Sequence, residues 1–151
     1  MLYELLGFIP WGPVQITQLS VVVLYCLDYV HVRGYLLGPD PVTSAGGLDT
    51  LIDACVAVLF GLAFHSIEKM PSRAFACLAA YAVLILIYNL SRDRTTAIGF
   101  TIYILMLGLF VVLVLFHPTP TVSSAGLTCA SVCLYAFHVV RSGRSQVGLR
   151  E

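Results

Sequence analysis

Five long apolar stretches alternate along the chain with short segments that contain its prolines and most of its charged residues. Each stretch has about the 17 to 25 residues that a helix needs to cross a bilayer core of roughly 30 Å. The pattern predicts an all-α protein, a polytopic transmembrane helix bundle that forms a single transmembrane domain over residues 1–151. The five predicted spans are residues 14–32, 51–67, 74–90, 97–116 and 122–140.

The prolines support this division, because all of them lie outside the apolar stretches. A proline is tolerated at the first turn of a helix, so Pro13 and Pro71 are expected to open the first and third spans. The last span is the most polar, since residues 123–128 are only mildly apolar. A four-span protein with a peripheral last helix is therefore the alternative.

The segments that flank the spans predict how the chain sits in the membrane. Residues 1–12 contain Tyr3 and Trp11 in an apolar setting, which is typical of an interfacial segment. Residues 141–151 form a polar tail. With five spans, Lys69 and Arg73 share one side, and the opposite side has more basic residues, namely Arg33, Arg92, Arg94, Arg141, Arg144 and Arg150. Basic loops favour the cytoplasmic side. We expect the N-terminus outside and the C-terminus on the cytoplasmic or an equivalent side.

Composition agrees with a lipid environment and excludes several classes of function. Hydrophobic residues make up 59% of the 151 residues and charged residues 11%, compared with about a quarter charged in a soluble domain. The eight basic and eight acidic residues balance and form no basic run, so a nucleic-acid partner is not expected. The five cysteines include no CxxC pair, and neither a metal nor another cofactor is expected.

Four ionisable residues lie near the ends of their spans that the five-span topology places at the inner interface. They are Asp28, His31, Asp53 and His138. One interpretation is that water and headgroups solvate them, because groups near an interface are inexpensive to place. The other is an inward-facing cluster that forms a proton or cation site, which fits the residue types but has no diagnostic spacing.

The second span has a polar and small-residue stripe along one face. Residues at every fourth position line one gently winding side of a helix, and here these residues are Asp49, Asp53, Ala57, Gly61 and His65. The stripe is either a packing seam for a neighbouring helix or one wall of a hydrated pathway. Its middle has no polar side chain, which favours the seam. Similar close-approach pairs in other spans are Ala76 with Ala80 and Gly126 with Ala130.

No segment has a catalytic or nucleotide-binding signature, so an enzyme is not expected and no catalytic residue is assigned. The hypothesis that fits best is a non-catalytic subunit, assembly factor or scaffold of a larger membrane complex. Its partners would be the lipid bilayer and other transmembrane helices, in a hetero-complex or a homo-oligomer.

An alternative is an oligomeric ion or proton channel or transporter lined by the second span, with Asp53 and His65 at its mouths. A third hypothesis is an intramembrane enzyme acting on lipid headgroups, with Asp28, His31 and His138 as acid and base candidates.

Overall fold

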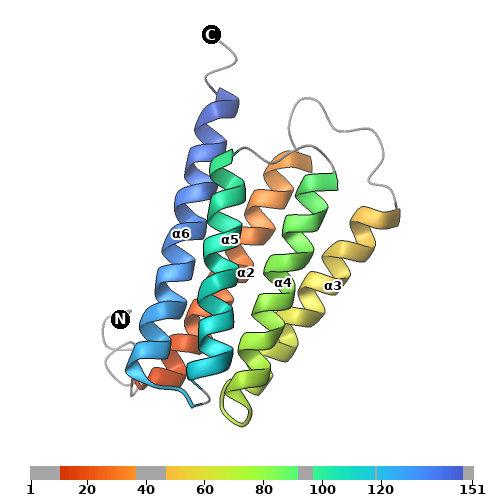
Figure 1. The fold of residues 1–151 in the computed structure, drawn as a ribbon. Coiled ribbons are helices and arrows are strands. Elements are labelled where there is room, and N and C mark those ends of the chain that lie inside the picture. Colours follow the sequence, from red (N-terminus) through yellow and green to blue (C-terminus); the bar gives the residue numbers. More distant parts are fainter. Residues whose placement is uncertain (1–10, 37–46, 92–96, 118, 148–151) are drawn as a thin grey trace, which may run out of the picture.

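The structure is a computed structural model that describes the backbone of residues 11–36, 47–91, 97–117 and 119–147. Side chains are described for residues 11–31, 51–90, 97–117 and 119–141. The predicted interfacial segment 1–12 lies almost wholly outside the described residues. The described chain contains α-helices and no strand, which confirms the predicted all-α bundle (Figure 1). The helices are α2 (Pro13–Leu36), α3 (Gly47–Ser66), α4 (Pro71–Ser91), α5 (Ala97–Phe116) and α6 (Val122–Val147).

The helices begin where the sequence offers a start signal. Pro13 and Pro71 are the first residues of α2 and α4, as predicted. The start of α6 is capped reciprocally by two hydroxyl side chains. The Ser124 backbone N–H donates to Thr121 Oγ1 over 3.2 Å, and the Thr121 backbone N–H donates to Ser124 Oγ over 2.8 Å. This exchange satisfies amide groups that have no partner within the helix.

Four helices extend beyond the predicted apolar runs. The helices α3 and α4 do so mainly at their first residues, Gly47 and Pro71, and α2 and α6 at their ends. The run 14–32 becomes α2, which ends at Leu36, and the run 122–140 becomes α6, which ends at Val147. The predicted polar tail 141–151 therefore begins as helix. The backbone hydrogen bonds of a helix form in lipid and in water alike, whereas the apolar run marks only the part that suits the bilayer.

Four of the helices are long and apolar enough to cross a membrane. Their qualifying stretches are Pro13–His31, Pro71–Leu90, Ala97–Phe116 and Val122–Arg141. In α3, which runs from Gly47 to Ser66, the apolar stretch within the described side chains is Leu51–Ser66. The four-span alternative named the last helix as peripheral, but α6 has a qualifying stretch and packs against both α2 and α5. The orientation of the bundle in the membrane stays a prediction.

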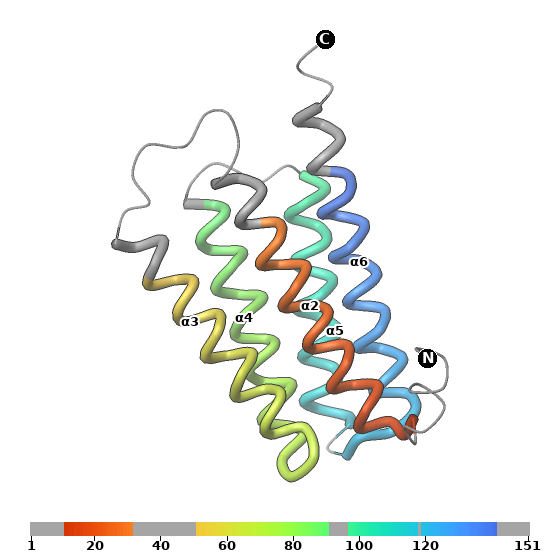
Figure 2. The backbone as a smooth tube through the Cα atoms, turned by 180° about the vertical axis from the view of Figure 1, so that it is seen from behind, coloured from red at the N-terminus to blue at the C-terminus, as the bar shows by residue number. Residues whose placement is uncertain are grey.

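The helices form a closed ring in which neighbours in sequence are neighbours in space. Each helix packs against the next, and α6 completes the ring by packing against α2 (Figure 2). Consecutive helices run in opposite directions, whereas α2 and α6 run in the same direction (Figure 1). Across the ring, the described backbones of α2 and α4 make no contact. Long side chains must therefore span the interior.

The interior is filled by large apolar and aromatic side chains. Leu24, Phe75, Met106 and Phe110 have exposed fractions of 0%. The outer surface is also apolar, with Leu115 exposed at 67% and Val122 at 80%. A water-soluble protein rarely leaves so much large apolar surface uncovered. The apolar outer surface is compatible with contact to a lipid bilayer.

The contact between α2 and α6 is formed by buried hydroxyl side chains. Thr17 and Ser20 on α2 and Thr128 and Ser131 on α6 are buried, and each hydroxyl donates to the backbone carbonyl four residues earlier in its own helix. Ser20 Oγ also lies 3.3 Å from Cys129 Sγ on α6. Small hydroxyl residues let helices approach closely in membranes, which explains how the least apolar helix joins the bundle.

Candidate functional site

A buried carboxyl group joins three helices inside the ring. Asp28 on α2 has an exposed fraction of 4%. Its Oδ1 atom accepts a hydrogen bond from the Tyr81 hydroxyl of α4 over 2.8 Å and another from the Tyr135 hydroxyl of α6 over 2.7 Å. The backbones of α2 and α4 do not touch, so the length of the Tyr81 side chain makes this link possible.

The two tyrosines are themselves held firmly by packing. Both Tyr81 and Tyr135 are 0% exposed. Phe60 on α3 packs edge-on against Tyr81, with 4.7 Å between ring centroids. Buried tyrosines almost always direct their hydroxyl to a partner, and Asp28 supplies it for both. The carboxyl group is thus positioned by side chains from the opposite side of the ring.

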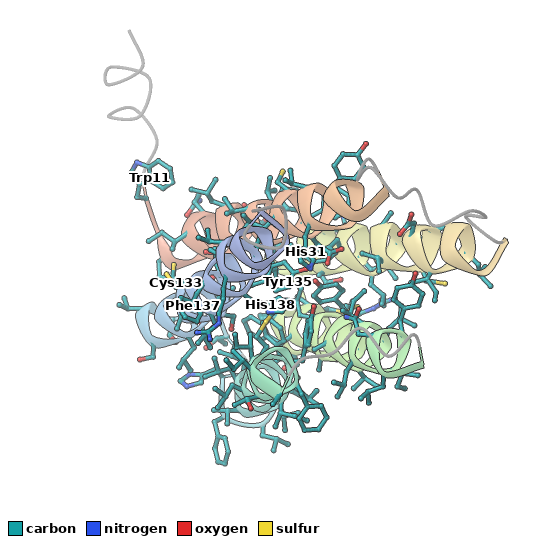
Figure 3. All side chains as sticks on the ribbon, turned by 90° about the horizontal axis from the view of Figure 1, so that it is seen from above. Trp11, His31, Cys133, Tyr135, Phe137 and His138 are labelled. Carbon is teal, nitrogen blue, oxygen red and sulfur yellow. The ribbon has the colours of Figure 1, made fainter. Side chains whose placement is uncertain are left out.

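Two histidines lie beside this group, towards the end of the bundle where α2 ends. The His31 ring on α2 is 5.3 Å from the His138 ring on α6, measured between centroids. His138 also lies 5.4 Å from the ring of Tyr103, a buried residue of α5. Figure 3 shows His31, Tyr135 and His138 gathered inside the bundle when it is viewed from this end. We call the whole set the Asp28 cluster: Asp28, His31, Tyr81, Tyr103, Tyr135 and His138.

The electrostatic setting of Asp28 is unusual for a carboxyl group. Asp28 lies within the stretch Pro13–His31 that is apolar enough to cross a membrane. Asp28 lies three residues before the end of this stretch, where an ionised Asp costs less than the roughly 2.5–3.5 kcal/mol that insertion scales give for the centre of a spanning helix. A side-chain hydrogen bond within a membrane bundle contributes roughly 0.6–1.7 kcal/mol. Within the described part of the chain, both hydrogen bonds end on Oδ1, and no Lys or Arg nitrogen forms an ion pair with the carboxyl group.

The structure brings together three of the four ionisable residues proposed from the sequence. Asp28, His31 and His138 lie in one cluster. Asp28 is buried beside the aromatic ring of Tyr135 and is not solvated at the surface. Asp53 on α3 is exposed and is not part of this buried group. The convergence of a carboxyl group with two imidazoles is the arrangement that acid-base or proton-transfer chemistry uses.

Sequence reasoning missed the three tyrosines of the cluster. Tyr81, Tyr103 and Tyr135 lie in apolar runs, where tyrosine is most simply interpreted as a core residue. A usable signal was present, since a carboxyl group buried in a span requires hydrogen-bond donors from other helices. Tyrosines in the other spans are the natural donors.

The described residues of the α3 stripe occupy exposed positions of the helix. Asp53, Ala57, Gly61 and His65 are all exposed, and a Cβ atom added to Gly61 would meet nothing within 4 Å. We call these four residues the α3 outer face. The side chain of Asp49, the fifth member of the predicted stripe, lies outside the described residues. Within the described chain, this face is therefore not a seam between two of the chain's own helices.

The other small-residue pairs behave in the same way. Ala76 and Ala80 on α4 are exposed, and so are Gly126 and Ala130 on α6. Gly126, like Gly61, has open space where a Cβ atom would lie. Small residues on these helices are thus available to a partner outside the chain.

Metal and disulfide chemistry have little structural support. Among the described residues, no group of three or more His, Cys, Asp or Glu side chains could hold a metal ion. The five cysteines are free thiols.

No protein-family model, curated protein or solved structure matches the chain. Function therefore has to be argued from the Asp28 cluster and the α3 outer face.

Proposed function

We propose that the protein is a non-catalytic subunit, assembly factor or scaffold of a larger membrane protein complex, and that its α3 outer face binds a transmembrane helix of another subunit. The observation that carries this proposal is the outward position of Ala57 and Gly61. Small residues one turn apart let a second helix approach closely, and this approach drives helix association in membranes. The described part of the chain leaves that position open.

The charges on the face favour a different protein over a second copy. In a dimer with a two-fold axis along the membrane normal, equivalent residues meet near the axis. Asp53 would then approach Asp53 of the other copy, and like charges so placed repel each other.

The proposal is tested by a bulky substitution on this face. Gly61→Leu fits the chain without a clash, so the protein should fold while its partner is displaced. Gly108→Leu is the matched control, because Gly108 on α5 is equally exposed and open but lies on another helix. Each tagged variant is purified from native membranes in mild detergent. We expect the co-purifying subunit to fall about tenfold or more with Gly61→Leu, the loss that 1.4 kcal/mol produces, and to be retained with Gly108→Leu.

Three outcomes would contradict the proposal. One is a strictly monomeric wild-type protein with no co-purifying subunit. Another is equal retention of the partner by both variants, which would place the contact elsewhere. The third is a homo-oligomer that Gly61→Leu disrupts, which would show that the occupant of the face is a second copy.

A second candidate function is an oligomeric ion or proton conductor lined by α3. The specific observation that favours it is the exposure of Asp53 and His65 near opposite ends of the same helix. Rings of such residues would line the two mouths of a pore formed by several copies. The double variant Asp53→Asn with His65→Ala should then reduce ion or proton flux in proteoliposomes at least severalfold. Unchanged flux would remove this candidate.

A further inference from the structure

We propose that Asp28 is a proton-binding site within the membrane-spanning part of the bundle, and that His31 and His138 transfer protons between it and the end of the bundle where α2 ends. This inference goes beyond a role in assembly, because it assigns chemistry to the interior of the ring. It rests on the hydrogen bonds of Asp28, on its burial and on the position of the two imidazole rings.

The first step is the unequal use of the two carboxyl oxygens. Oδ1 accepts both tyrosine hydrogen bonds, from Tyr81 and from Tyr135. In the described part of the chain, Oδ2 accepts none, although the side chain is only 4% exposed. Buried polar atoms are nearly always paired. A proton on Oδ2 makes the group a neutral acid and leaves Oδ1 free to accept from both tyrosines.

The second step is the charge of the surroundings. The titratable groups that face Asp28 from the other helices are the hydroxyls of Tyr81 on α4, Tyr103 on α5 and Tyr135 on α6. His31 on α2 and His138 on α6 complete the set, and Asp53 on α3 adds an exposed carboxylate, not a cation. None of these described groups has a permanent positive charge. Within the described part of the chain, only a mobile species could neutralise the charge on an ionised Asp28.

The third step identifies the mobile species as a proton. Hard metal cations in proteins take six or more oxygen ligands. The described cluster offers one unused carboxyl oxygen, surrounded by aromatic and imidazole rings, which is too few ligands for such a cation. A proton needs only that oxygen.

The fourth step concerns the path by which a proton reaches Asp28 from the end of the bundle. His31 is one helical turn from Asp28 and is therefore on the same side of α2. His138 lies 5.3 Å from His31, ring to ring, and three residues before Arg141, where the apolar stretch of α6 ends. Histidine exchanges its proton readily near neutral pH. The three groups thus lead from the end of the bundle to its interior.

The transfer is a simple exchange of one proton. An N–H bond of the His31 imidazolium breaks, an O–H bond forms at Asp28 Oδ2, and both groups become neutral. His31 then recovers a proton from the imidazolium of His138, which in turn takes one from water at the end of the bundle. The reverse sequence releases the proton, and no oxidant, metal or further reactant is required.

Infrared difference spectroscopy of the full chain in phosphatidylcholine vesicles tests the site. We expect the carbonyl stretch of a protonated carboxylic acid at neutral pH, where ordinary exposed carboxyl groups are ionised, and this band should shift in deuterated water. The band should be lost with Asp28→Asn and retained with Asp53→Asn, the matched variant at an exposed carboxyl group. Asp28→Glu should shift the band, which keeps the test valid if Asp28→Asn does not fold.

The route is tested by the rate at which this band responds to a rapid pH jump. Replacing both His31 and His138 by Phe should slow the response about 100-fold or more, the scale that a positioned proton donor contributes. Absence of the band in the wild-type protein, or its retention in Asp28→Asn, would overturn the site. Loss of the band on addition of sodium ions at constant pH would assign the site to a cation instead. An unchanged rate in the histidine variant would overturn the route.

Discussion

Two aspartates on neighbouring helices experience opposite environments in this bundle. Asp28 on α2 is buried and accepts two tyrosine hydrogen bonds, whereas Asp53 on α3 is exposed on the outer surface. Both lie in helices that are mainly apolar. The comparison shows that depth along a span does not decide the role of a polar residue. The face of the helix on which the residue lies decides it.

The histidines extend the same contrast. His31 and His138 are half-buried and face each other at 5.3 Å between ring centroids, while His65 is exposed on the α3 outer face. The inner region is thus tied together by contacts that cross the ring. On the outer face, the described chain leaves Ala57 and Gly61 uncovered. The inner region should therefore be sensitive to substitution in the isolated protein, and the outer face should be sensitive only when a partner is present.

The largest effect is expected from truncating the centre of the inner region. Tyr135→Ala removes a 0% exposed ring and one of the two donors to Asp28, and it leaves a cavity. We expect it to lower the free energy of unfolding by about 3 kcal/mol or more. Equilibrium unfolding of the purified protein in mixed micelles measures this change.

The matched control lies two residues further along the same helix. Phe137 is 56% exposed, so Phe137→Ala removes a ring of similar size from the outer surface. Its effect on unfolding should stay within about 0.5 kcal/mol. Equal losses from the two substitutions would break the contrast between inside and outside, and would show that α6 is held by a partner or lipid on its exposed face.

Much of the fold follows from the sequence because the bilayer imposes a simple rule. Each span must be long and apolar, and proline must stay outside it except at its first turn. The run 97–116 and the helix Ala97–Phe116 coincide for this reason. Helix ends outside the bilayer do not need to be apolar, which explains why α2 and α6 extend beyond the apolar runs.

Which face of each helix lies inside could not be predicted in the same way. In a water-soluble helix, the apolar face marks the core, but here lipid makes the outer face apolar too. Residues 104–116 of α5 contain no polar side chain, so nothing in that run distinguishes its buried residues Met106, Phe110 and Leu113 from the rest. The spacing of the small residues of α3, and the lack of polar side chains between them, predicted a seam for a neighbouring helix, and these residues are exposed in the described chain, so that seam stays a prediction. Asp28 was the better guide, since a buried carboxyl group requires donors on other helices.

A smaller effect is expected from removing one hydroxyl of the inner region while keeping the ring. Tyr81→Phe preserves the packing against Phe60 and deletes one donor to Asp28 Oδ1. The unfolding free energy should fall by about 0.6–1.7 kcal/mol, the range for side-chain hydrogen bonds within membrane bundles.

Tyr25→Phe is the control, because Tyr25 is 36% exposed and its ring contact with Phe60 does not need the hydroxyl. It should change stability by less than about 0.5 kcal/mol. If the two substitutions changed stability equally, the hydrogen bond from Tyr81 to Asp28 would add nothing to the stability that the packing of the Tyr81 side chain provides. Asp28 and Asp53 would then differ only in how deeply they are buried.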